Sequence, residues 1–371
     1  MKVLTLFKTY LPDSFTGIER VIWQIAEGTY PLGVETHVFT LSAHPKGAPF
    51  AEAHHTVHQA KLDLYVASSG LSISAFGMFR ELARTADLVH YQFPWPMADA
   101  LHFYARHGKP TVLTYQSDIV RQKSLLPFYR PLMMRFLRSV DAIVATSPNY
   151  LASSPMLAQF RDKTSVIPIG LGAAPPAAAD RVRAWQERLG PRFFLFLGVL
   201  RYYKGLPALL EAARQTGLPV VIAGDGPLRD EVASTRPPNV TSLGAVSEED
   251  KLALIEACTA FVFPSALRTE AFGIALAEAA RAGKPLISCE IGTGTSYINV
   301  DGETGFVVPP NDAKALAAAM RRLWDDDALR TRMGEAAAAR FETHFRADSM
   351  ARAYVDLYAR LLEQHGRSTR R

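Results

Sequence analysis

Short apolar runs alternate with helix-like patterns along the whole chain. The first run, residues 2–7, predicts a strand, and residues 17–33 then carry apolar side chains at helical spacing. Further apolar runs predict strands at 35–41, 87–93, 110–115 and 142–147. Strands that alternate with helices in this way form a parallel sheet with helices on both faces. The first part of the chain is therefore expected to be a doubly wound α/β domain.

The same alternation restarts after a change of composition near Gly170. Residues 167–181 are rich in Gly, Ala and Pro and read as a linker. Strand-like runs then follow at 193–198, 218–227, 239–244, 260–265, 284–289 and 305–310. The pattern predicts two Rossmann-like α/β domains, residues 1–172 and 173–345, with a cleft between them. The remainder, 346–371, predicts a last amphipathic helix to about residue 363 and a disordered tail over 365–371.

Length and composition agree with this division. A chain of 371 residues is longer than one ordinary domain, and 48% apolar with 21% charged residues is typical of a soluble globular protein. The net charge of +5 selects no partner, and no motif indicates nucleic-acid binding. The chain has no run of about 18 apolar residues and no signal peptide, so a cytoplasmic location is expected. Cys258 and Cys289 lack metal-ligand spacing and are expected to be buried as small apolar side chains.

The first chemical signal is a pair of glutamates in the segment 268–288. Glu270 and Glu278 flank a helix start expected near Phe272, where free backbone N–H groups and the helix dipole favour an anion. Gly273 lets a ligand approach the backbone closely. Eight helical residues rise about 12 Å, which is too far for the two carboxylates of a glycosidase. The spacing fits a sugar nucleotide, with sugar hydroxyls and a ribose at its ends and a diphosphate between them. An ordinary surface helix with two solvated glutamates is the alternative.

Two cations follow the apolar run at 193–198. Arg201 and Lys204 lie in the loop "GVLRYYKG", at the carboxyl end of a predicted strand, where ligands of doubly wound sheets bind. Together they could neutralise a diphosphate and stabilise it as a leaving group. Two basic residues in a loop can also simply face solvent. Gly17, between the first strand and first helix, is a possible phosphate loop that lacks the G-x-G-x-x-G fingerprint, which argues against a dinucleotide dehydrogenase.

Taken together, these segments resemble family 4 glycosyltransferases, which are retaining enzymes of the GT-B fold. The resemblance covers nearly the whole chain and is carried by residues 198–205, 223–227, 261–288 with its two glutamates, and 302–312. The glutamate pair is the specific element. Residues 115–132, 145–155 and 287–305 resemble the bacterial mannosyltransferases that build O-antigen and related polysaccharides.

The resemblance implies a role for each matching residue. Arg201 and Lys204, in the loop that begins at Gly198, would bind the donor diphosphate, Glu270 the donor sugar hydroxyls, and Glu278 the ribose. Backbone N–H groups would come from Phe272, Gly273 and Ile274, and the base would lie near Gly244 to Lys251. Gly17 would lie under the phosphates from the other domain, and the last helix would cross back to the N-terminal domain.

One position departs from the family pattern. Many relatives carry a histidine near the reacting sugar where this chain has Gln116. A glutamine can donate and accept hydrogen bonds, but it cannot take a proton. Either proton handling does not need an imidazole here, or the enzyme is slower or altered in substrate. Asp118 is close by and is the next candidate side chain.

The resemblance also implies the substrates. The expected donor is a GDP-activated mannose-type sugar, mannose or D-rhamnose, and the expected acceptor is a lipid-linked saccharide. The diphosphate would leave from the face on which the acceptor attacks, so catalysis would rest on positioning and electrostatics, without a metal or other cofactor. A UDP-sugar donor, a sugar-nucleotide epimerase and a non-catalytic sugar-nucleotide binder remain alternatives.

Three further segments have competing interpretations. Residues 121–138 mix basic and large apolar side chains, which suits either contact with anionic lipid at the inner face of the membrane or a packed helix with a solvated basic side. The acidic run 325–327 is expected to cap a helix. His54 and His58 have i, i+4 ligand spacing, but no helical pattern supports it, and a polar loop is expected.

Overall fold

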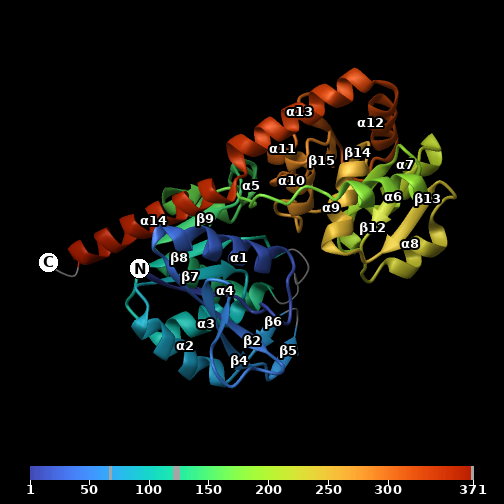
Figure 1. The fold of residues 1–371 in the computed structure, drawn as a ribbon. Helices are drawn as coiled ribbons and strands as arrows, with labels where there is room; N and C mark the ends of the chain where they lie inside the picture. The colour runs from blue at the N-terminus through green and yellow to red at the C-terminus, as the bar shows by residue number, and fades with distance from the viewer. Residues whose placement is uncertain (67–68, 120–125, 369–371) are drawn as a thin grey trace. The chain divides into compact units, whose positions relative to one another are not determined.

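The computed structural model describes residues 1–66, 69–119 and 126–368. Contacts divide the chain into two compact units, which we call unit 1 (Met1–Gly172 with Arg346–Arg371) and unit 2 (Ala173–Phe345). Each unit has its own sheet, with helices that pack on it (Figure 1).

Unit 1 is built on an eight-stranded sheet in which only β3 runs antiparallel to its neighbour. In sheet order the strands are β10 (Thr164–Val166), β9 (Ala142–Ala145), β8 (Thr111–Tyr115), β7 (Leu88–Phe93), β1 (Lys2–Leu6), β2 (Glu35–Ser42), β4 (His55–Lys61) and β3 (Phe50–Glu52). A separate hairpin pairs β5 (Leu64–Val66) with β6 (Ser69–Leu71). The chain order reverses at β1, which pairs with β2 on one side and β7 on the other.

The helices of unit 1 include the last helix of the chain. They are α1 (Gly17–Thr29), α2 (Ser74–Thr85), α3 (Pro96–Ala105), α4 (Leu126–Ser139), α5 (Pro148–Ser153) and α14 (Ala347–Ser368). In Figure 1, α14 runs beside α1, and a Cβ on Gly28 of α1 would lie 3.0 Å from the Cβ of Ala351. The connection into α14 is held by the N–H of Ala347, which donates to the carbonyl of Leu171 at 3.0 Å.

The expectation of a disordered tail from residue 365 is wrong for residues 365–368, because α14 continues to Ser368. Leu361 anchors the helix in the core of unit 1. An ion pair between Glu363 and Arg367 supports the additional turn.

Unit 2 has a six-stranded, fully parallel sheet. In sheet order the strands are β13 (Val240–Gly244), β12 (Val220–Ala223), β11 (Phe194–Leu197), β14 (Ala260–Phe263), β15 (Leu286–Cys289) and β16 (Gly305–Val308). The helices are α6 (Ala179–Leu189), α7 (Leu206–Thr216), α8 (Arg229–Thr235), α9 (Glu248–Ala257), α10 (Ile274–Arg281), α11 (Thr295–Ile298), α12 (Ala313–Asp325) and α13 (Asp327–His344). The chain order reverses between β11 and β14.

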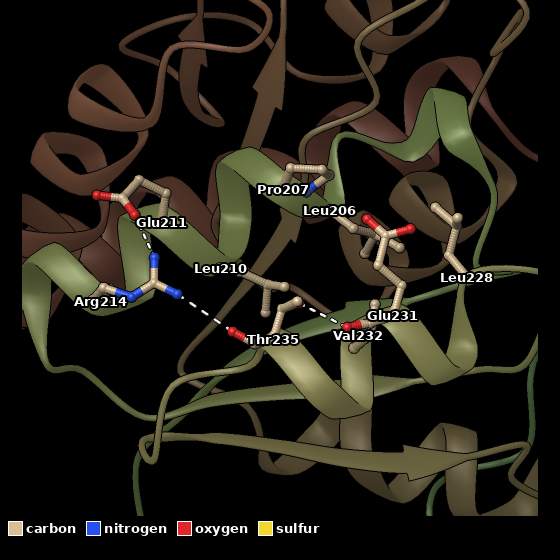
Figure 2. A pocket seen from close by; sticks show the side chains of 9 residues that line it. All are labelled: Leu206, Pro207, Leu210, Glu211, Arg214, Leu228, Glu231, Val232 and Thr235. Carbon is tan, nitrogen blue, oxygen red and sulfur yellow. Dashed lines mark hydrogen bonds and ion pairs between the residues drawn. The ribbon is translucent and has the colours of Figure 1, made fainter.

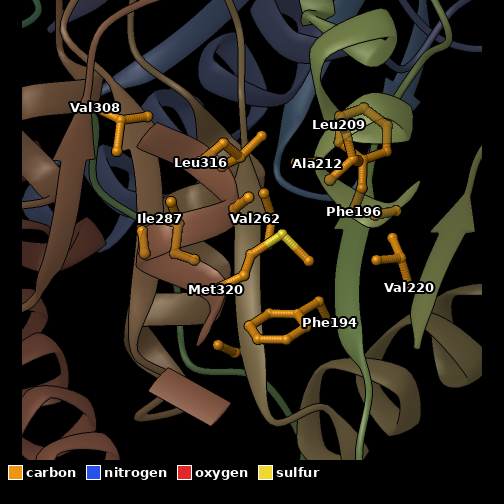
Figure 3. Close-up of a cluster of buried hydrophobic side chains, with 14 of the residues drawn as sticks. Phe194, Phe196, Leu209, Ala212, Val220, Val262, Ile287, Val308, Leu316 and Met320 are labelled. Carbon is orange, nitrogen blue, oxygen red and sulfur yellow. The ribbon is translucent and has the colours of Figure 1, made fainter. Parts of the chain in front are cut away.

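The core of unit 2 explains why its strands read as continuous apolar runs. Figure 3 shows Phe194 and Val262 of the central strands in one buried cluster with Leu209 of α7 and Met320 of α12. Parallel strands covered by helices on both faces are buried on both sides, so they need apolar residues at every position. The two Rossmann-like domains predicted from the sequence are confirmed.

Several smaller expectations are settled by the same structure. Cys258 and Cys289 are buried, as predicted, and burial raises the pKa of each thiol to about 12. Asp326 caps α13 by accepting from the N–H of Leu329 at 2.8 Å. The expectation of a polar loop at residues 54–58 is wrong, because His55 and His58 belong to β4, in which Val57 between them is fully buried.

Candidate functional site

The two loops that carry the predicted donor-binding residues meet where the strand order of unit 2 reverses. β11 and β14 are neighbours, but the chain continues from them to opposite sides of the sheet. Ligands of open α/β sheets bind outside the carboxyl ends of the strands at such a reversal. Arg201 and Lys204 follow β11, while Glu270 and the start of α10 follow β14. All four features therefore lie at one edge of the sheet.

Lys204 and Glu270 form an ion pair across this reversal point. Nζ of Lys204 lies 2.5 Å from Oε2 of Glu270, and both side chains are largely buried. The same Nζ lies 4.6 Å from the centre of the Phe263 ring, where the face of the aromatic ring attracts a cation. The pair leaves Lys204 in a fixed position at the carboxyl ends of the two central strands.

Arg201 differs from Lys204 because it is exposed. Its guanidinium forms a hydrogen bond with the side chain of Tyr203. Burial and the nearby Glu270 raise the pKa of the Tyr203 hydroxyl to about 12, so it remains protonated at neutral pH. The site thus combines one fixed, partly shielded cation with one that is open to solvent.

Glycines allow the neighbouring loops to touch at backbone level. A Cβ on Gly224 would lie 1.9 Å from the carbonyl oxygen of Gly198, and a Cβ on Gly205 would lie 1.9 Å from that of Pro264. The N–H of Gly224 also donates to the carbonyl of Gly244 at 2.7 Å. Gly198 and Gly244, both predicted to contact the donor, therefore lie within one compact set of loops.

The helix that follows Glu270 begins at Ile274, two residues later than expected. Gly273 caps it with a φ of +96°, a conformation that disfavours any residue with a Cβ, so the helix cannot extend back to Phe272. The Phe272 side chain is buried against Phe345, which leaves only its backbone for a ligand. Glu278 lies about one turn inside the helix, about 6 Å along its axis from Ile274, not two turns.

Glu278 has a partner that the sequence did not indicate. Nζ of Lys251, in the first turn of α9, lies 2.7 Å from Oε1 of Glu278, and both residues are only 5% exposed. Lys251 also pairs with the exposed Glu248. Lys251 belongs to the segment that the family resemblance assigns to the base. The signal that could have revealed it is its spacing, because it shares a helix face with the apolar Leu254 and Ile255.

In unit 1, the loop before Gly17 is organised by a buried carboxylate. Glu19 is 3% exposed and accepts hydrogen bonds from Thr9 (2.6 Å), Ser14 (3.0 Å) and Thr16 (2.8 Å). These three hydroxyls span the connection between β1 and α1. The first helical residue, Gly17, is therefore held at the carboxyl end of β1, at the strand-order reversal of unit 1.

Gln116 and Asp118 directly follow β8. Gln116 is 5% exposed, and its Nε2 donates to Oε1 of Gln92 at 2.7 Å. Oδ1 of Asp118 accepts from the hydroxyl of Tyr115 at 2.9 Å and from Ser154 at 3.0 Å. This oxygen of Asp118 therefore stabilises its own loop.

The structure groups the predicted residues into two sets. Unit 2 brings Arg201, Lys204 and Glu270 together and pairs Glu278 with Lys251, while unit 1 carries Gly17, Gln116 and Asp118 at the edge of its own sheet. A pocket of about 220 Å³ lies between α7 and α8 (Figure 2). It is lined by residues such as Leu210 and Val232 and includes none of the predicted site residues. Within the described ranges, no group of three or more His, Cys, Asp or Glu residues could hold a metal ion.

The segment predicted to touch a membrane is only partly described, because residues 120–125 lie outside the described residues. In α4, Met133 and Phe136 are buried, while Arg135 is exposed and lies 4.7 Å from the ring centre of Phe103. This half of the segment is a packed helix with a solvated basic side, although Phe128 is 86% exposed. Among the helices of the described chain, none has the length and apolar character needed to cross a bilayer.

Comparison with known sequences connects this geometry with a family. Residues 15–174 match the model described as Glycosyltransferase Family 4, and residues 180–340 match Glycosyl transferases group 1. The D-rhamnosyltransferase WbpZ of Pseudomonas aeruginosa is 53% identical over 355 residues, 94% of this chain and 93% of that protein. The O-antigen chain mannosyltransferase C of Escherichia coli is 48% identical over 368 residues, 98% of this chain and 99% of that protein.

Solved structures of low sequence identity share the fold. A sucrose-phosphate synthase from Thermosynechococcus elongatus superimposes with a TM-score of 0.79 at 20% identity, covering 98% of this chain and 99% of its own. The Anabaena protein Alr3699/HepE, in complex with UDP, gives a TM-score of 0.73 at 19% identity, covering 97% of this chain and all of its own. At these identities the likeness concerns the fold alone.

Proposed function

The chain belongs to glycosyltransferase family 4, the retaining enzymes of the GT-B fold, and on that basis we propose that it moves a mannose-type hexose from a GDP-sugar to a lipid-linked saccharide in O-antigen synthesis. That it is a glycosyltransferase follows from the family. The observation that supports the place of the donor site is the Lys204–Glu270 pair at the strand-order reversal of unit 2. A cation for the diphosphate there lies beside a carboxylate suited to sugar hydroxyls.

Unit 2 would contribute to catalysis mainly by stabilising charge. As the bond to the sugar breaks, negative charge develops on the leaving diphosphate, and Arg201 and Lys204 would stabilise it together with the N–H groups at the start of α10. Glu270 would hold the sugar through its hydroxyls, and Glu278 the ribose. We propose that no metal is needed, because the two cations and the helix start supply the positive charge.

The identity of the sugar and of the base rests on the relatives. The two relatives that cover nearly the whole chain are named for D-rhamnosyl and mannosyl transfer. D-rhamnose is a mannose without its C6 hydroxyl, so one type of pocket can serve both sugars. A UDP-sugar is the second candidate donor, since the related fold of the Anabaena protein has been solved with UDP.

The direct test is sugar transfer from radiolabelled GDP-mannose, UDP-glucose and UDP-N-acetylglucosamine to a short alkyl mannoside. We expect transfer or slow hydrolysis with GDP-mannose and much less with the two UDP-sugars. A thermal-shift measurement gives an independent readout, because a nucleotide that binds the folded state raises Tm by mass action. Turnover with a UDP-sugar alone would show that the donor is a UDP-sugar and not a GDP-sugar. The absence of turnover with any of these nucleotide sugars would refute the proposal.

The membrane contact proposed for residues 121–138 has its own test. We expect the protein to bind vesicles that contain anionic lipid and to be released by high salt, because the attraction is electrostatic. Equal binding to neutral vesicles, or none to either, would contradict it.

A further inference from the structure

A chain of buried hydrogen bonds runs from Gln116 into the core of unit 1 and ends on α14. Nε2 of Gln116 contacts Oε1 of Gln92 at 2.7 Å, and Nε2 of Gln92 lies 3.3 Å from Nε2 of His90. The other ring nitrogen of His90 lies 2.8 Å from the hydroxyl of Tyr358. Gln92, His90 and Tyr358 are each at most 1% exposed. These hydrogen bonds therefore connect the edge of the sheet with α14, which is far from β7 and β8 in the sequence.

A second branch meets the same histidine. The hydroxyl of Thr114 lies 2.7 Å from Nε2 of His90 and 2.8 Å from the hydroxyl of Tyr354 on α14. Thr114 of β8 pairs with Gln92 of β7, His90 lies one alternate position earlier on β7, opposite Val112, and Gln116 directly follows β8. One imidazole thus joins two adjacent strands and two turns of α14.

The charge state of His90 gives this chain a direction. Burial lowers the pKa of His90 to about 3, so at neutral pH its ring is uncharged and carries a single N–H. An amide nitrogen only donates, so with this orientation of Gln92 the Nε2 of His90 is an acceptor, and the nearer Thr114 hydroxyl donates to it as well. The ring proton then lies on Nδ1 and donates to Tyr358. The carbonyl of Gln92 faces the other way and accepts from Gln116.

This direction determines which atom Gln116 offers to a ligand. Because its amide nitrogen is held by Gln92, its carbonyl oxygen points away from Gln92, on the other side of Cδ. That oxygen accepts no hydrogen bond from any residue that the structure describes. Gln116 follows β8, next to β7, and β7 flanks the strand-order reversal of unit 1, where a ligand of this sheet is expected.

We propose that His90 is a positioning residue: through Gln92 it orients Gln116 so that the Gln116 carbonyl oxygen accepts a hydrogen bond from a sugar hydroxyl. The inference rests on the proposed function, since it requires a sugar at this edge. The hydroxyl can belong to the transferred sugar or to the acceptor. A ligand that lacks this hydroxyl is expected to lose the contact, so the hydrogen bonds from His90 through Gln92 to Gln116 would contribute to sugar specificity.

Kinetics with four forms of the full chain test the proposal: the wild type, Gln116→Met, His90→Leu and the double variant. GDP release from GDP-mannose is measured with and without an alkyl mannoside as acceptor. We expect each single variant to lower kcat/KM about threefold to tenfold, the effect of one lost neutral hydrogen bond. The double variant is expected to be no slower than Gln116→Met, because His90 acts through Gln116. His90→Gln, which can still accept from Gln92, is expected to recover most of the loss.

A matched control separates positioning from general damage. His102→Leu likewise removes a histidine of unit 1, a half-buried one that bonds to Tyr91 and Ser139 and not to Gln92 or Gln116. We expect it to lower Tm without changing kcat/KM. A loss in His102→Leu as large as in His90→Leu, or losses that multiply in the double variant, would overturn the proposal.

The two possible sources of the hydroxyl give different results. If it belongs to the donor sugar, the single variants slow GDP release without acceptor as well as transfer. If it belongs to the acceptor, GDP release without acceptor is unchanged and the acceptor KM rises. Wild-type protein that turns over none of the nucleotide sugars would instead refute the proposed function itself.

The direction of the chain can be measured without turnover. Nitrogen NMR of protein labelled in its histidine rings is expected to show His90 protonated on Nδ1 and not titrating between pH 5 and 9. Protonation on Nε2 would reverse every bond in the chain and turn the Gln116 amide nitrogen toward the ligand. That result would overturn the assignment.

Discussion

Replacing Lys251 by methionine tests whether the Lys251–Glu278 pair sustains the base-and-ribose end of unit 2. The substitution keeps the length and apolar stem of the side chain, but it leaves Glu278, only 5% exposed, without the cation that lies 2.7 Å away. Removing one partner of a buried ion pair costs about 3–5 kcal/mol, because the remaining charge stays desolvated. The second partner, Glu248, is exposed and adds little.

The expected shift follows from the size of the unit. For a domain of 150–250 residues, 1 kcal/mol corresponds to about 2–4 °C in Tm, so a loss of about 3 kcal/mol lowers the Tm of unit 2 by roughly 6–12 °C. Differential scanning calorimetry measures this, and added GDP identifies the transition of unit 2. Glu248→Gln, which removes the exposed partner of the same lysine, is the control and should shift Tm by about 1–2 °C at most.

A double-mutant cycle gives the decisive comparison. In Lys251→Met with Glu278→Gln, the buried charge is gone, so the double variant should be clearly more stable than the sum of the two single losses predicts. Additive losses, or a Lys251→Met shift below about 2 °C, would refute the argument that Lys251 neutralises a buried Glu278.

Three further predictions concern other parts of the chain. Arg201→Met should lower kcat about 100-fold, as for one lost donor to a developing anion. Its Tm should be nearly unchanged, because the side chain is exposed. A mild effect on kcat in a radiolabel assay would contradict a role of Arg201 in stabilising the leaving diphosphate. Gly224→Ala should lower both Tm and GDP affinity, because the added Cβ would lie 1.9 Å from the carbonyl oxygen of Gly198. The control Gly217→Ala has a φ of +69° but nothing within 4 Å of its Cβ, so it should cost only about 1 kcal/mol of backbone strain. Equal effects of the two variants in calorimetry and in GDP titration would count against the close approach. Acid should unfold unit 1 before unit 2. The pKa of His90 falls from 6.5 to about 3 on folding, so the unfolded chain binds more protons than the folded chain between these pH values. The stability that is present above pH 6.5 is therefore lost as the pH falls toward 3. Calorimetry from pH 7.5 to 4.5 should show this, with a flatter profile in His90→Gln; an unchanged profile in that variant would rule His90 out as the cause.

The apolar pattern was sufficient to predict both sheets and the places of the loops in which the candidate site residues lie. The run at 193–198 indicated β11, and the basic loop after it and the glutamate loop after β14 lie together because parallel strands end at one edge. The approach of a ligand to the backbone at Gly273 stays a prediction of the local sequence. The sequence did not indicate that Gly273 takes a positive φ, which delays the start of α10 to Ile274.

The missed residues are those whose partners come from distant strands and helices. Lys251 finds Glu278 only after α9 and α10 have packed on the same sheet, and His90 finds Tyr358 only through the last helix of the chain. In each case a polar residue occupied a position that the helical or strand pattern reserves for the core. A buried position filled by a polar side chain is therefore a useful signal for a long-range partner, although its identity requires the fold.

The position of α14 in unit 1 also has a consequence for biosynthesis. While a ribosome is still translating, β7 and β8 already exist, but the hydroxyls of Tyr354 and Tyr358 that complete their polar core do not. All of unit 2 must be made in between, which takes roughly 10–35 s at about 5–20 residues per second. Throughout that interval the nascent first unit lacks its last helix, so the part of its core that α14 covers stays open to solvent.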